Sequence, residues 1–553
     1  MSLSPLFQIP PEILLDCIEL LDYKSLLTCR QVCRQLRNLV DEDAACQYTL
    51  DLYTAGLEDG PSFSGTLSDR FAALNQYREG WDQLKWRDAQ MDVPMKQGGL
   101  WELYGGVLAQ QTQTKTFEFT RLPGISRGIA SNTWSLEKQR YKVRDFGMDP
   151  SQDLLVLLEK PGLDGYSHDW VHRAHFLSLE KNPGAPHPLA KGGPVISHAQ
   201  NFMDPEMSYT IQVSGNLVGI LIHTIQAGEN EFLVWDWKSG ERKLYLTGDE
   251  IRAFTFLSDQ HVLLCVLDLF PVEDEDVEPT LVVVDIQRSG AGEPENILRL
   301  DECIVLHCPP FQDTVGIASF GIRADPSPTW RPDEKSSIPF HLARDNRLYV
   351  VTLWIQVQNN ALPLWVNLFI PSSTFMSVVK STPKDASGPH SVSWEAWGQE
   401  GSRLMISDLP QSHTWVCYVY GTRYIALEPH QKGNEKVWCR VYDFNDLPIR
   451  RGQLNVKPEN VIEKDSEMVS PRVSAEVVYQ TGPITLKSGK IFKDDVTSTL
   501  PFRWKSVELD ILASERKCAI MCSEDNIIIV NSTSSMGVKH VVGSNALLMQ
   551  SRS

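Results

Sequence analysis

The sequence predicts an α+β multidomain protein in which a helical N-terminal part precedes a much larger all-β part. Up to about residue 86, apolar residues recur at steps of three and four, which is the period of an amphipathic helix. From about residue 100 onward, short apolar runs alternate with turn-forming residues, which is typical of strands. Because 553 residues exceed what one small core holds, we expect several domains or a repeat array.

The first forty residues predict three short helices with more apolar surface than they can bury. Pro10 and Pro11 suit the first turn of a helix, and Glu12 complements the positive end of its dipole. A unit of about 40 residues is near the lower limit for independent folding, so a partner or a neighbouring domain must cover the surplus. The apolar residues at helical spacing are Ile13, Leu14, Cys17, Ile18 and Leu21, followed by Leu26, Cys29, Cys33, Leu36 and Val40.

This segment resembles the F-box. The family opens with leucine-proline-x-glutamate-isoleucine, which Ile9-Pro10-Pro11-Glu12-Ile13 matches apart from its first residue. The central leucine pair is matched by Leu26-Leu27, and the valine-cysteine-arginine by Val32-Cys33-Arg34, whereas Leu36 stands where an aromatic residue is frequent. The alternative is an ordinary helical hairpin packed on its own domain.

The resemblance implies a trihelical module that docks on the Skp-type adaptor of cullin-RING ubiquitin ligases. The remainder of the chain would then choose the protein to be ubiquitinated. The residues that the resemblance assigns to adaptor contact are Ile9, Pro10, Ile13, Leu14, Ile18, Leu26, Leu27, Val32 and Leu36.

A linker with a spacer helix is expected between the F-box and the β-rich part. Residues 60–65 are rich in turn formers, and residues 67–86 again carry apolar side chains at steps of three and four. The expected domains are the F-box at 1–50, the helical linker at 51–99, the β-rich domain at 100–545 and a tail at 546–553.

Two short elements recur along the β-rich part. The first is a small polar turn before a buried strand, at 151–153, 214–216, 258–261 and 421–423. The second closes a strand with an aspartate, at Asp236, Asp285 and Asp443. These strand ends, above all residues 233–240, resemble the end of a WD-type propeller blade, in which the aspartate follows the third strand and ties its turn.

The resemblance implies a β-propeller-like domain with six to eight blades and irregular insertions. A propeller closes by pairing strands from both ends, and the expected partners are residues 517–530 and residues 100–119. Two stacked β-sandwiches are the alternative, since alternating strands suit both.

Composition narrows the classes of partner. The net charge of −18 argues against a nonspecific nucleic-acid binder, which needs a basic surface. No secretory signal or membrane-spanning run is recognisable. The eleven cysteines lie mostly in apolar runs and suggest reduced thiols, so we expect a cytoplasmic or nuclear protein.

Catalytic and metal motifs are weak. His168, Asp169, His172 and His175 form the densest set of possible ligands, but His172 and His175 would point to opposite faces of a strand. Residues 316–321 lack the first glycine of a nucleophile elbow. We therefore expect no catalytic residue, metal or cofactor.

The sequence accordingly predicts a substrate-recognition subunit of an SCF-type ubiquitin ligase, not an enzyme itself. Its expected partners are the Skp-type adaptor, a cullin through that adaptor, and an unknown protein substrate. One alternative is a propeller scaffold that uses the F-box for adaptor binding outside any ligase. The other is a propeller enzyme, such as a glycoside hydrolase, with an incidental helix pair.

Overall fold

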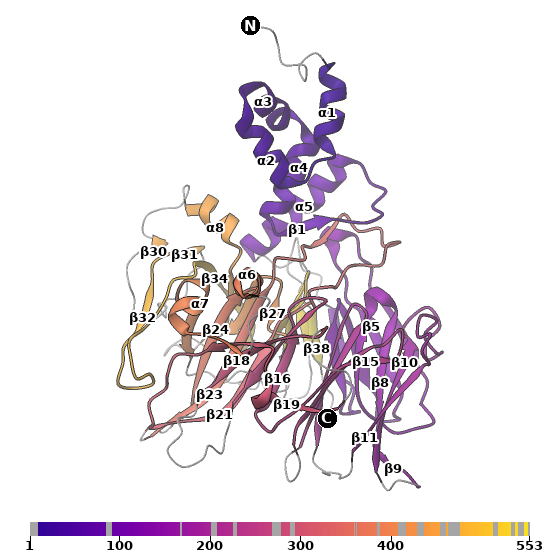
Figure 1. Ribbon diagram of the computed structural model, residues 1–553. Helices are drawn as coiled ribbons and strands as arrows, with labels where there is room; N and C mark the ends of the chain where they lie inside the picture. The colour runs from indigo at the N-terminus through magenta and orange to yellow at the C-terminus, as the bar shows by residue number, and fades with distance from the viewer. Residues whose placement is uncertain are drawn as a thin grey trace.

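Four short helices form an N-terminal module that stands on the β-rich region (Figure 1). They are α1 (Pro11–Glu19), α2 (Tyr23–Val32), α3 (Arg34–Glu42) and α4 (Ala44–Thr54). The computed structural model describes residues 9–84, 91–165, 169–200, 207–224, 229–267, 278–287, 293–358, 360, 362–383, 388–407, 416–428, 436–453, 461–462, 476–512, 518–531, 537–539 and 547–550.

Local capping explains where two of these helices begin. The side chain of Asp22 accepts a hydrogen bond from Ser25 N at 2.8 Å, and that of Asp43 accepts one from Cys46 N at 2.7 Å. The apolar faces of the four helices then share a small core of their own, separate from the β-rich region. Its buried members are Leu14, Ile18, Leu26, Leu36, Val40 and Cys46.

A short strand and a long helix connect this module to the β-rich region. Strand β1 (Leu57–Asp59) pairs with β22 (Phe340–Leu342), and helix α5 (Leu67–Gln83) follows. Thr66 and Asp69 form a reciprocal capping box at the start of α5. We call α1–α5 with β1 the stalk, which Figure 1 shows at the top of the molecule.

Six sheets follow one another as the blades of a β-propeller between residues 101 and 512, and a further sheet closes the ring. The first has β3 (Trp101–Tyr104), β4 (Val107–Gln111), β5 (Phe117–Arg121) and β6 (Asn132–Leu136). The second has β7 (Val143–Asp149), β8 (Leu154–Glu159), β10 (Trp170–Ser178) and β11 (Val195–Gln200), with β9 (Gly162–Leu163). The third has β12 (Ser208–Ser214), β13 (Leu217–His223), β14 (Glu231–Asp236) and β15 (Glu241–Thr247), with β19 (Glu295–Asn296).

The next three blades carry the longer insertions. The fourth has β16 (Ile251–Phe256), β17 (His261–Val266), β18 (Thr280–Asp285) and β20 (Cys303–His307), with β25 (His390–Val392). The fifth has β21 (Val315–Arg323), β23 (Leu348–Val357), β24 (Leu364–Pro371) and β26 (Arg403–Ser407). The sixth has β27 (Val419–Tyr420), β28 (Arg423–Leu427), β29 (Lys436–Asp443), β34 (Phe502–Leu512), β31 (Val478–Gln480) and β30 (Val461–Ile462).

Insertions within these blades form the remaining described elements. They are the helices α6 (Ser372–Ser381), α7 (Trp394–Gly401) and α8 (Asp446–Gln453), and the hairpin of β32 (Ile484–Leu486) with β33 (Val496–Ser498). Three single turns of 3-10 helix, η2 (Ile125–Arg127), η3 (Pro150–Gln152) and η4 (Ile297–Arg299), complete the described list.

The predicted aspartate turns are confirmed. Each aspartate follows the third strand of its sheet and accepts hydrogen bonds from backbone N–H groups one turn further on. Asp236 accepts from residues 238 and 239 at 2.9 and 3.0 Å, Asp285 from Gln287 at 2.9 Å, and Asp443 from Asn445 at 3.1 Å. The polar turns also lie where expected, between the first and second strands of their sheets.

The ring closes with a strand that the sequence did not reveal. Strands β35 (Cys518–Cys522), β36 (Ile527–Asn531), β37 (Gly537–Lys539) and β38 (Leu547–Gln550) form a sheet with β2 (Met91–Pro94), which pairs with β38 in parallel. Residues 517–530 contribute β35 and most of β36 to this sheet, as expected, but the strands that pair with β2 are β37 and β38, further along the chain. The N-terminal partner is β2, because residues 101–121 form the first blade. β2 lies within the range expected to be linker, and β38 reaches into the expected tail.

Candidate functional site

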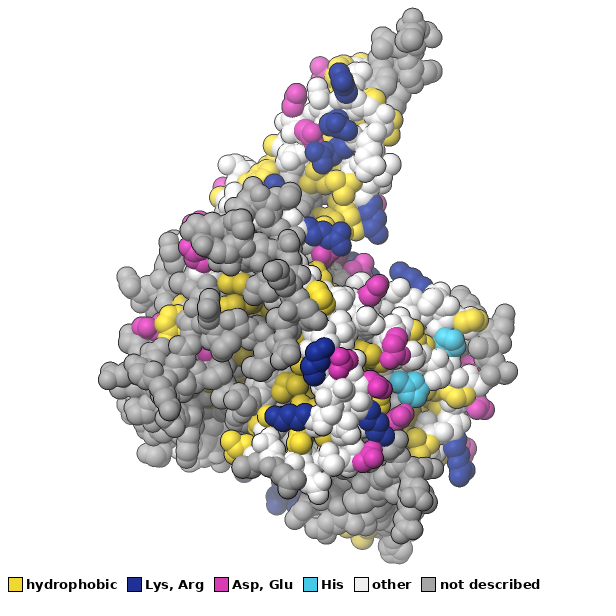
Figure 2. Space-filling view, turned by 90° about the vertical axis from the view of Figure 1, so that its left-hand side faces the viewer, with side chains coloured by type: hydrophobic (Ala, Val, Ile, Leu, Met, Phe, Trp, Pro, Cys, Tyr) yellow, Lys and Arg dark blue, Asp and Glu magenta, His cyan; other side chains and the backbone are white. Residues whose placement is uncertain are grey.

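The tip of the stalk exposes an unusual number of large apolar side chains. Ile9 is 40% exposed, Ile13 52%, Leu20 88% and Val32 67%. Ten large hydrophobic side chains are exposed among the described residues, and these four fall within 24 positions of one another. Figure 2 shows the stalk standing clear of the β-rich body, with hydrophobic side chains at its surface. Such a concentration is typical of a protein–protein contact surface.

Three of these side chains belong to one row along α1. Ile9, Ile13, Cys17 and Leu20 are all exposed, and they follow one another at steps of four, four and three residues. This spacing places Ile13, Cys17 and the C-cap residue Leu20 on a single face of the helix, while Ile9 lies just before the N-cap residue Pro10. We call these four residues the outer stripe. Leu14 and Ile18 lie on the opposite side and are buried in the core of the module.

The nine residues assigned to adaptor contact divide into two groups. Ile9, Pro10, Ile13 and Val32 are exposed, and Leu27 is partly buried. The other four are buried in the module's own core: Leu14, Ile18, Leu26 and Leu36. These four shape the module and present no free surface in this conformation.

The sequence assignment omitted two members of the outer stripe. Cys17 and Leu20 are exposed on α1, yet only residues matching the family motif were chosen. The four-four-three spacing from Ile9 is the signal that could have found them.

Basic side chains accompany this apolar surface. The guanidinium of Arg30 forms an ion pair with Asp41 at 2.6 Å, and Nε of Arg37 donates to the carbonyl of Arg30 at 3.0 Å. Arg34 is exposed at the start of α3. An acidic partner would meet a positive edge here, which would speed its association more than it would strengthen the complex.

The stalk is attached to the propeller through the far end of α5. Leu74, Tyr77 and Trp81 are buried in the same hydrophobic cluster as residues of the fifth and sixth blades. Arg423 of β28 donates to Tyr77 Oη at 2.8 Å, and its guanidinium lies 4.4 Å from the ring centroid of Trp81. A cation over an aromatic face adds directional attraction to the apolar contact.

A charged cluster fixes the last turn of α5. Arg503 of β34 forms ion pairs with Asp82 at 3.0 Å and with Asp443 at 2.7 Å. Burial alone would raise the pKa of Asp443, but Arg503 and Arg423 outweigh it and lower that pKa. The ammonium of Lys505 donates to the carbonyls of Asp82 and Gln83, which satisfies the free end of the helix. We call Arg423, Arg503 and Lys505 the stalk anchor.

The histidines of β10 have partners other than a metal. His172 Nε2 lies 2.7 Å from Gln200 Oε1, whereas His175 Nε2 lies 3.1 Å from Glu159 Oε2. His168 lies outside the described residues. Within the described part of the chain, no group of three or more His, Cys, Asp or Glu side chains could hold a metal ion. None of the described helices combines the length and the apolar character needed to cross a bilayer.

Comparison with known proteins identifies the N-terminal module. A model of the F-box domain matches residues 6–44. None of the curated proteins matches the chain.

Solved structures resemble the chain only distantly. Extracellular domains 1-2 of Drosophila Semaphorin 1b align at 8% identity with a TM-score of 0.33, covering 84% of this chain and 88% of that one. Kuenenia stuttgartiensis hydrazine synthase aligns at 11% identity with a TM-score of 0.25, covering 58% and 98%. Kluyveromyces lactis Hsv2 aligns at 8% identity with a TM-score of 0.26, covering 64% and 93%. The family model and the order of the sheets show that the chain carries an F-box domain, at residues 6–44, on a β-propeller.

Proposed function

We propose that this protein is the substrate-recognition subunit of an SCF-type ubiquitin ligase. F-box domains generally bind Skp-type adaptors, and an F-box joined to a propeller is typical of adaptor-binding proteins that recruit a substrate rather than of enzymes. The single observation that carries the proposal is the apolar surface left open on the F-box itself, formed by the outer stripe and Val32.

The mechanism we propose is proximity. The adaptor, through a cullin, would hold the ubiquitin-charged carrier, while the propeller would hold the target. When a target lysine is held beside the activated ubiquitin, their bimolecular reaction becomes effectively intramolecular, so the effective concentration of the lysine is much higher. The stalk anchor supports this mechanism because it fixes the F-box relative to the propeller.

Paired substitutions on the F-box test the proposal. In the variant with Ile13→Asp and Val32→Asp, two carboxylates would have to be desolvated at the adaptor contact, so we expect co-purification of the Skp-type adaptor to fall by about a hundredfold or more. Both side chains are exposed, so the melting temperature should stay unchanged. Leu298→Asp is the matched control, since Leu298 is 62% exposed on the propeller. Adaptor recovery equal to that of the control would contradict the proposal.

Leu26→Asp should act by a different route. Leu26 is fully buried inside the module, so a carboxylate there is desolvated within the fold itself rather than at a partner contact. We expect loss of adaptor binding together with loss of the helical signal of residues 11–54. The Ile13 and Val32 variant therefore reports on the contact, and the Leu26 variant on the fold.

A scaffold protein would differ from a ligase subunit in the proteins that are bound together with it. An adaptor that is recovered without cullin from an otherwise intact complex would favour a role outside a ligase.

A cytoplasmic or nuclear location, which we also propose, is supported by ten cysteines with free thiols among the described residues.

A further inference from the structure

A long connection in the fifth blade lies on the stalk side of the propeller. It joins β21 to β23 and takes 24 residues, 324–347, whereas two to four residues make the same turn in the other blades and in the closing sheet. Its start stays beside the sixth blade, because Gly421 N donates to the carbonyl of Asp325 at 2.7 Å. We call residues 324–342, which end with β22, the brace.

The brace reaches two blades that are neighbours neither of each other nor of the fifth. Tyr104, at the end of β3 in the first blade, donates through Oη to Ser327 Oγ at 2.9 Å and accepts from Ser327 N at 3.0 Å. In the third blade, the hydroxyl of Ser214 at the end of β12 lies 2.8 Å from that of Thr329. The brace therefore ties together distant parts of the ring.

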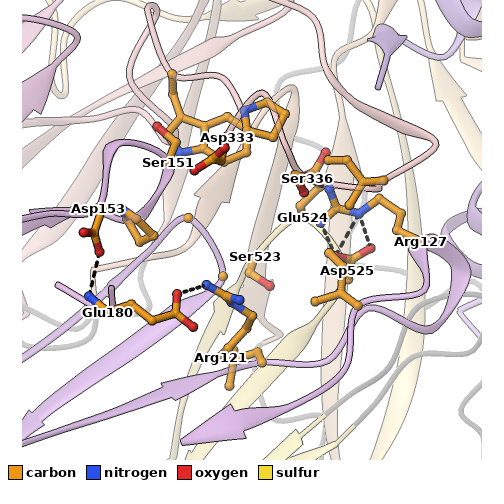
Figure 3. A pocket seen from close by; sticks show the side chains of 18 of the residues that line it. Arg121, Arg127, Ser151, Asp153, Glu180, Asp333, Ser336, Ser523, Glu524 and Asp525 are labelled. Carbon is orange, nitrogen blue, oxygen red and sulfur yellow. Dashed lines mark hydrogen bonds and ion pairs between the residues drawn. The ribbon is translucent and has the colours of Figure 1, made fainter. Parts of the chain in front are cut away.

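The second blade meets the brace across a cavity of about 330 Å³ (Figure 3). Figure 3 shows Asp333 and Ser336 of the brace on the wall of this cavity, together with Ser151 of the second blade and Arg127 of η2. Lys181, which follows β10, pairs with Asp333 at 2.8 Å. This ion pair is exposed and adds little stability, so the hydrogen bonds to the first, third and sixth blades hold the brace.

The other end of the brace holds the stalk. Strand β22 pairs with β1 over three residues, and Pro339 just before it accepts hydrogen bonds from Gly60 N at 3.0 Å and from Tyr48 Oη at 3.3 Å. Phe340 is fully buried, and its ring centroid lies 5.3 Å from that of Tyr77 in α5. Backbone and side-chain contacts thus join the brace to α4, β1 and α5.

The backbones of the stalk and the brace approach each other most closely at Gly60. A Cβ atom at this position would lie 1.7 Å from the carbonyl oxygen of Ile338. Only a residue without a side chain permits such an approach. Any larger residue at position 60 would push the stalk and the brace apart.

A single buried side chain bonds both ends of the brace. Arg347, which is 1% exposed, donates from Nε to the carbonyl of Pro326 at 2.9 Å. Its Nη1 donates to the carbonyl of Ala343 at 3.2 Å and to that of Arg344. The guanidinium therefore holds the start of the brace against the residues that directly follow its end.

This arginine is costly to keep. Among the described residues its partners are all backbone carbonyls, with no carboxylate in ion-pair contact, and burial lowers the pKa of Arg347. A buried charge without a counterion is unfavourable, whereas an apolar side chain of similar length would fill the space without that cost. What the guanidinium adds is its set of directed hydrogen bonds, so we infer that its role is geometric.

The stalk is therefore attached at two separate places. The stalk anchor holds the last turn of α5, and the brace holds residues 57–60, before α5 begins. A body held at one place can still turn about that place. A second attachment removes this rotation.

We propose that the brace fixes the orientation of the F-box relative to the propeller, and that Arg347 is the positioning residue that keeps the brace in place. The purpose of this device rests on the proposed function, in which the adaptor and the target must be held at a constant separation. The orientation itself can be measured without either partner.

Time-resolved energy transfer in the full-length protein tests this proposal, because it records a distribution of distances. The two fluorophores are attached through genetically encoded azide side chains at position 42 of α3 and position 197 of β11, where Glu42 and Ser197 are exposed. We expect a narrow distribution in the wild type and a broader one in Arg347→Met. Amide exchange at residues 57–59 and 340–342 should become faster by about tenfold or more.

Gly60→Ala tests the same device without touching a buried charge. The added methyl group must displace the carbonyl of Ile338, so this variant should also broaden the distribution. Gly162→Ala is its control, since no atom lies within 4 Å of a Cβ placed there. If Arg347→Met lowers the melting temperature sharply, Gly60→Ala decides the matter.

Arg403→Met is the control for the buried arginine. Arg403 is fully buried and donates only to the carbonyls of Gly482, Ser498 and Leu500, among the described residues, at distances of 2.6–3.2 Å. Its loss should lower stability but leave the distance distribution narrow, because it contacts neither the brace nor the stalk.

Three outcomes would overturn the proposal. They are a broad distribution in the wild type, a narrow one in both Arg347→Met and Gly60→Ala, and equal broadening in Arg403→Met. The variant with Ile13→Asp and Val32→Asp separates this proposal from the proposed function, since it should keep the narrow distribution. A failure of adaptor binding would therefore leave the orientation result standing.

Discussion

At the scale of single residues, apolar side chains of the F-box have two roles: some form its core, and others form its exposed surface. Leu14 and Ile18 lie in the core that the four short helices share, while Ile13 of α1 and Leu20, its C-cap residue, stay exposed. Helical periodicity predicted that Ile13, Leu14 and Ile18 lie on one helix, but it did not include Leu20. It could not separate the inner from the outer face, because both faces of α1 are apolar and only the packing of the other helices of the module decides which one is covered.

His172 is a second residue whose role only the structure reveals. Its Nε2–H donates to Gln200 Oε1, because Gln200 uses its own amide group to donate to Glu231 at 2.6 Å. Tyr209 Oη lies 3.2 Å from its Nδ1. Burial lowers the pKa of His172 to about 4, against a modest opposing effect of the Gln200 hydrogen bond. The sequence presented this residue as a possible metal ligand, since a strand pattern does not reveal which groups face it.

This histidine predicts acid sensitivity. The pKa of His172 in the folded state lies below the ordinary 6.5, so between pH 4 and 6.5 the unfolded chain binds more protons. Stability should therefore fall as pH drops through this window, by up to about 3 kcal/mol from this group. Urea unfolding at pH 7 and pH 5 measures the loss, and His172→Gln should show a smaller one. An identical loss in the variant would count against this role.

At the scale of elements, the attachment of α5 decides how the F-box is presented. Tyr77 and Trp81 were predicted to be apolar positions of a spacer helix, and both are buried against the propeller. The stalk anchor was not predicted, because Arg423, Arg503 and Lys505 lie more than 300 positions further along the chain. Nothing local in the sequence pairs them with residues 77–83.

Removing one member of the stalk anchor should loosen α5. Arg423→Met keeps the length of the side chain but loses the hydrogen bond to Tyr77 and the contact with the Trp81 ring, at a cost of about 2–4 kcal/mol. We expect amide hydrogens of residues 67–83 to exchange faster by about tenfold or more, while the sixth blade stays folded.

Arg450→Met provides the control for this experiment. Its ion pair with Asp446 is exposed on α8, so its loss should leave exchange unchanged. Equal protection of α5 in both variants would show that the stalk anchor does not hold the stalk.

At the scale of the whole molecule, the closing sheet of the propeller includes a strand, β2, that precedes the first blade in the sequence. The aspartate turns were predictable because a turn and its hydrogen bonds lie within a few residues. Strand β2 was not predictable, because its pairing with β38 joins positions more than 450 residues apart. We call this pairing of β2 with β38 the seam. Arg127 joins the first blade to the closing sheet, because its guanidinium lies 2.7 Å from the carboxylate of Glu524 and also pairs with Asp525, in the turn between β35 and β36.

Breaking the seam should weaken the entire ring. Val93 of β2 is 4% exposed and packs with Met521, Ile528 and Val530 of the closing sheet. Val93→Asp buries a carboxylate there, so we expect the free energy of unfolding to drop by several kcal/mol, with all blades melting earlier. Val195→Asp makes the same change at an exposed position of β11 and should melt like the wild type. Calorimetry distinguishes the two, and coincident melting curves would refute a closing role for β2.

The seam also bears on how the protein is made. On the ribosome, β2 emerges directly after the stalk, whereas β36 and β38 appear only when nearly all the remaining blades have been translated. Synthesis proceeds at roughly 5–20 residues per second, so the early strand waits tens of seconds with an unpaired edge. A prematurely terminated polypeptide would carry a finished F-box on an unsealed propeller, able to occupy the adaptor without presenting an intact receptor for cargo.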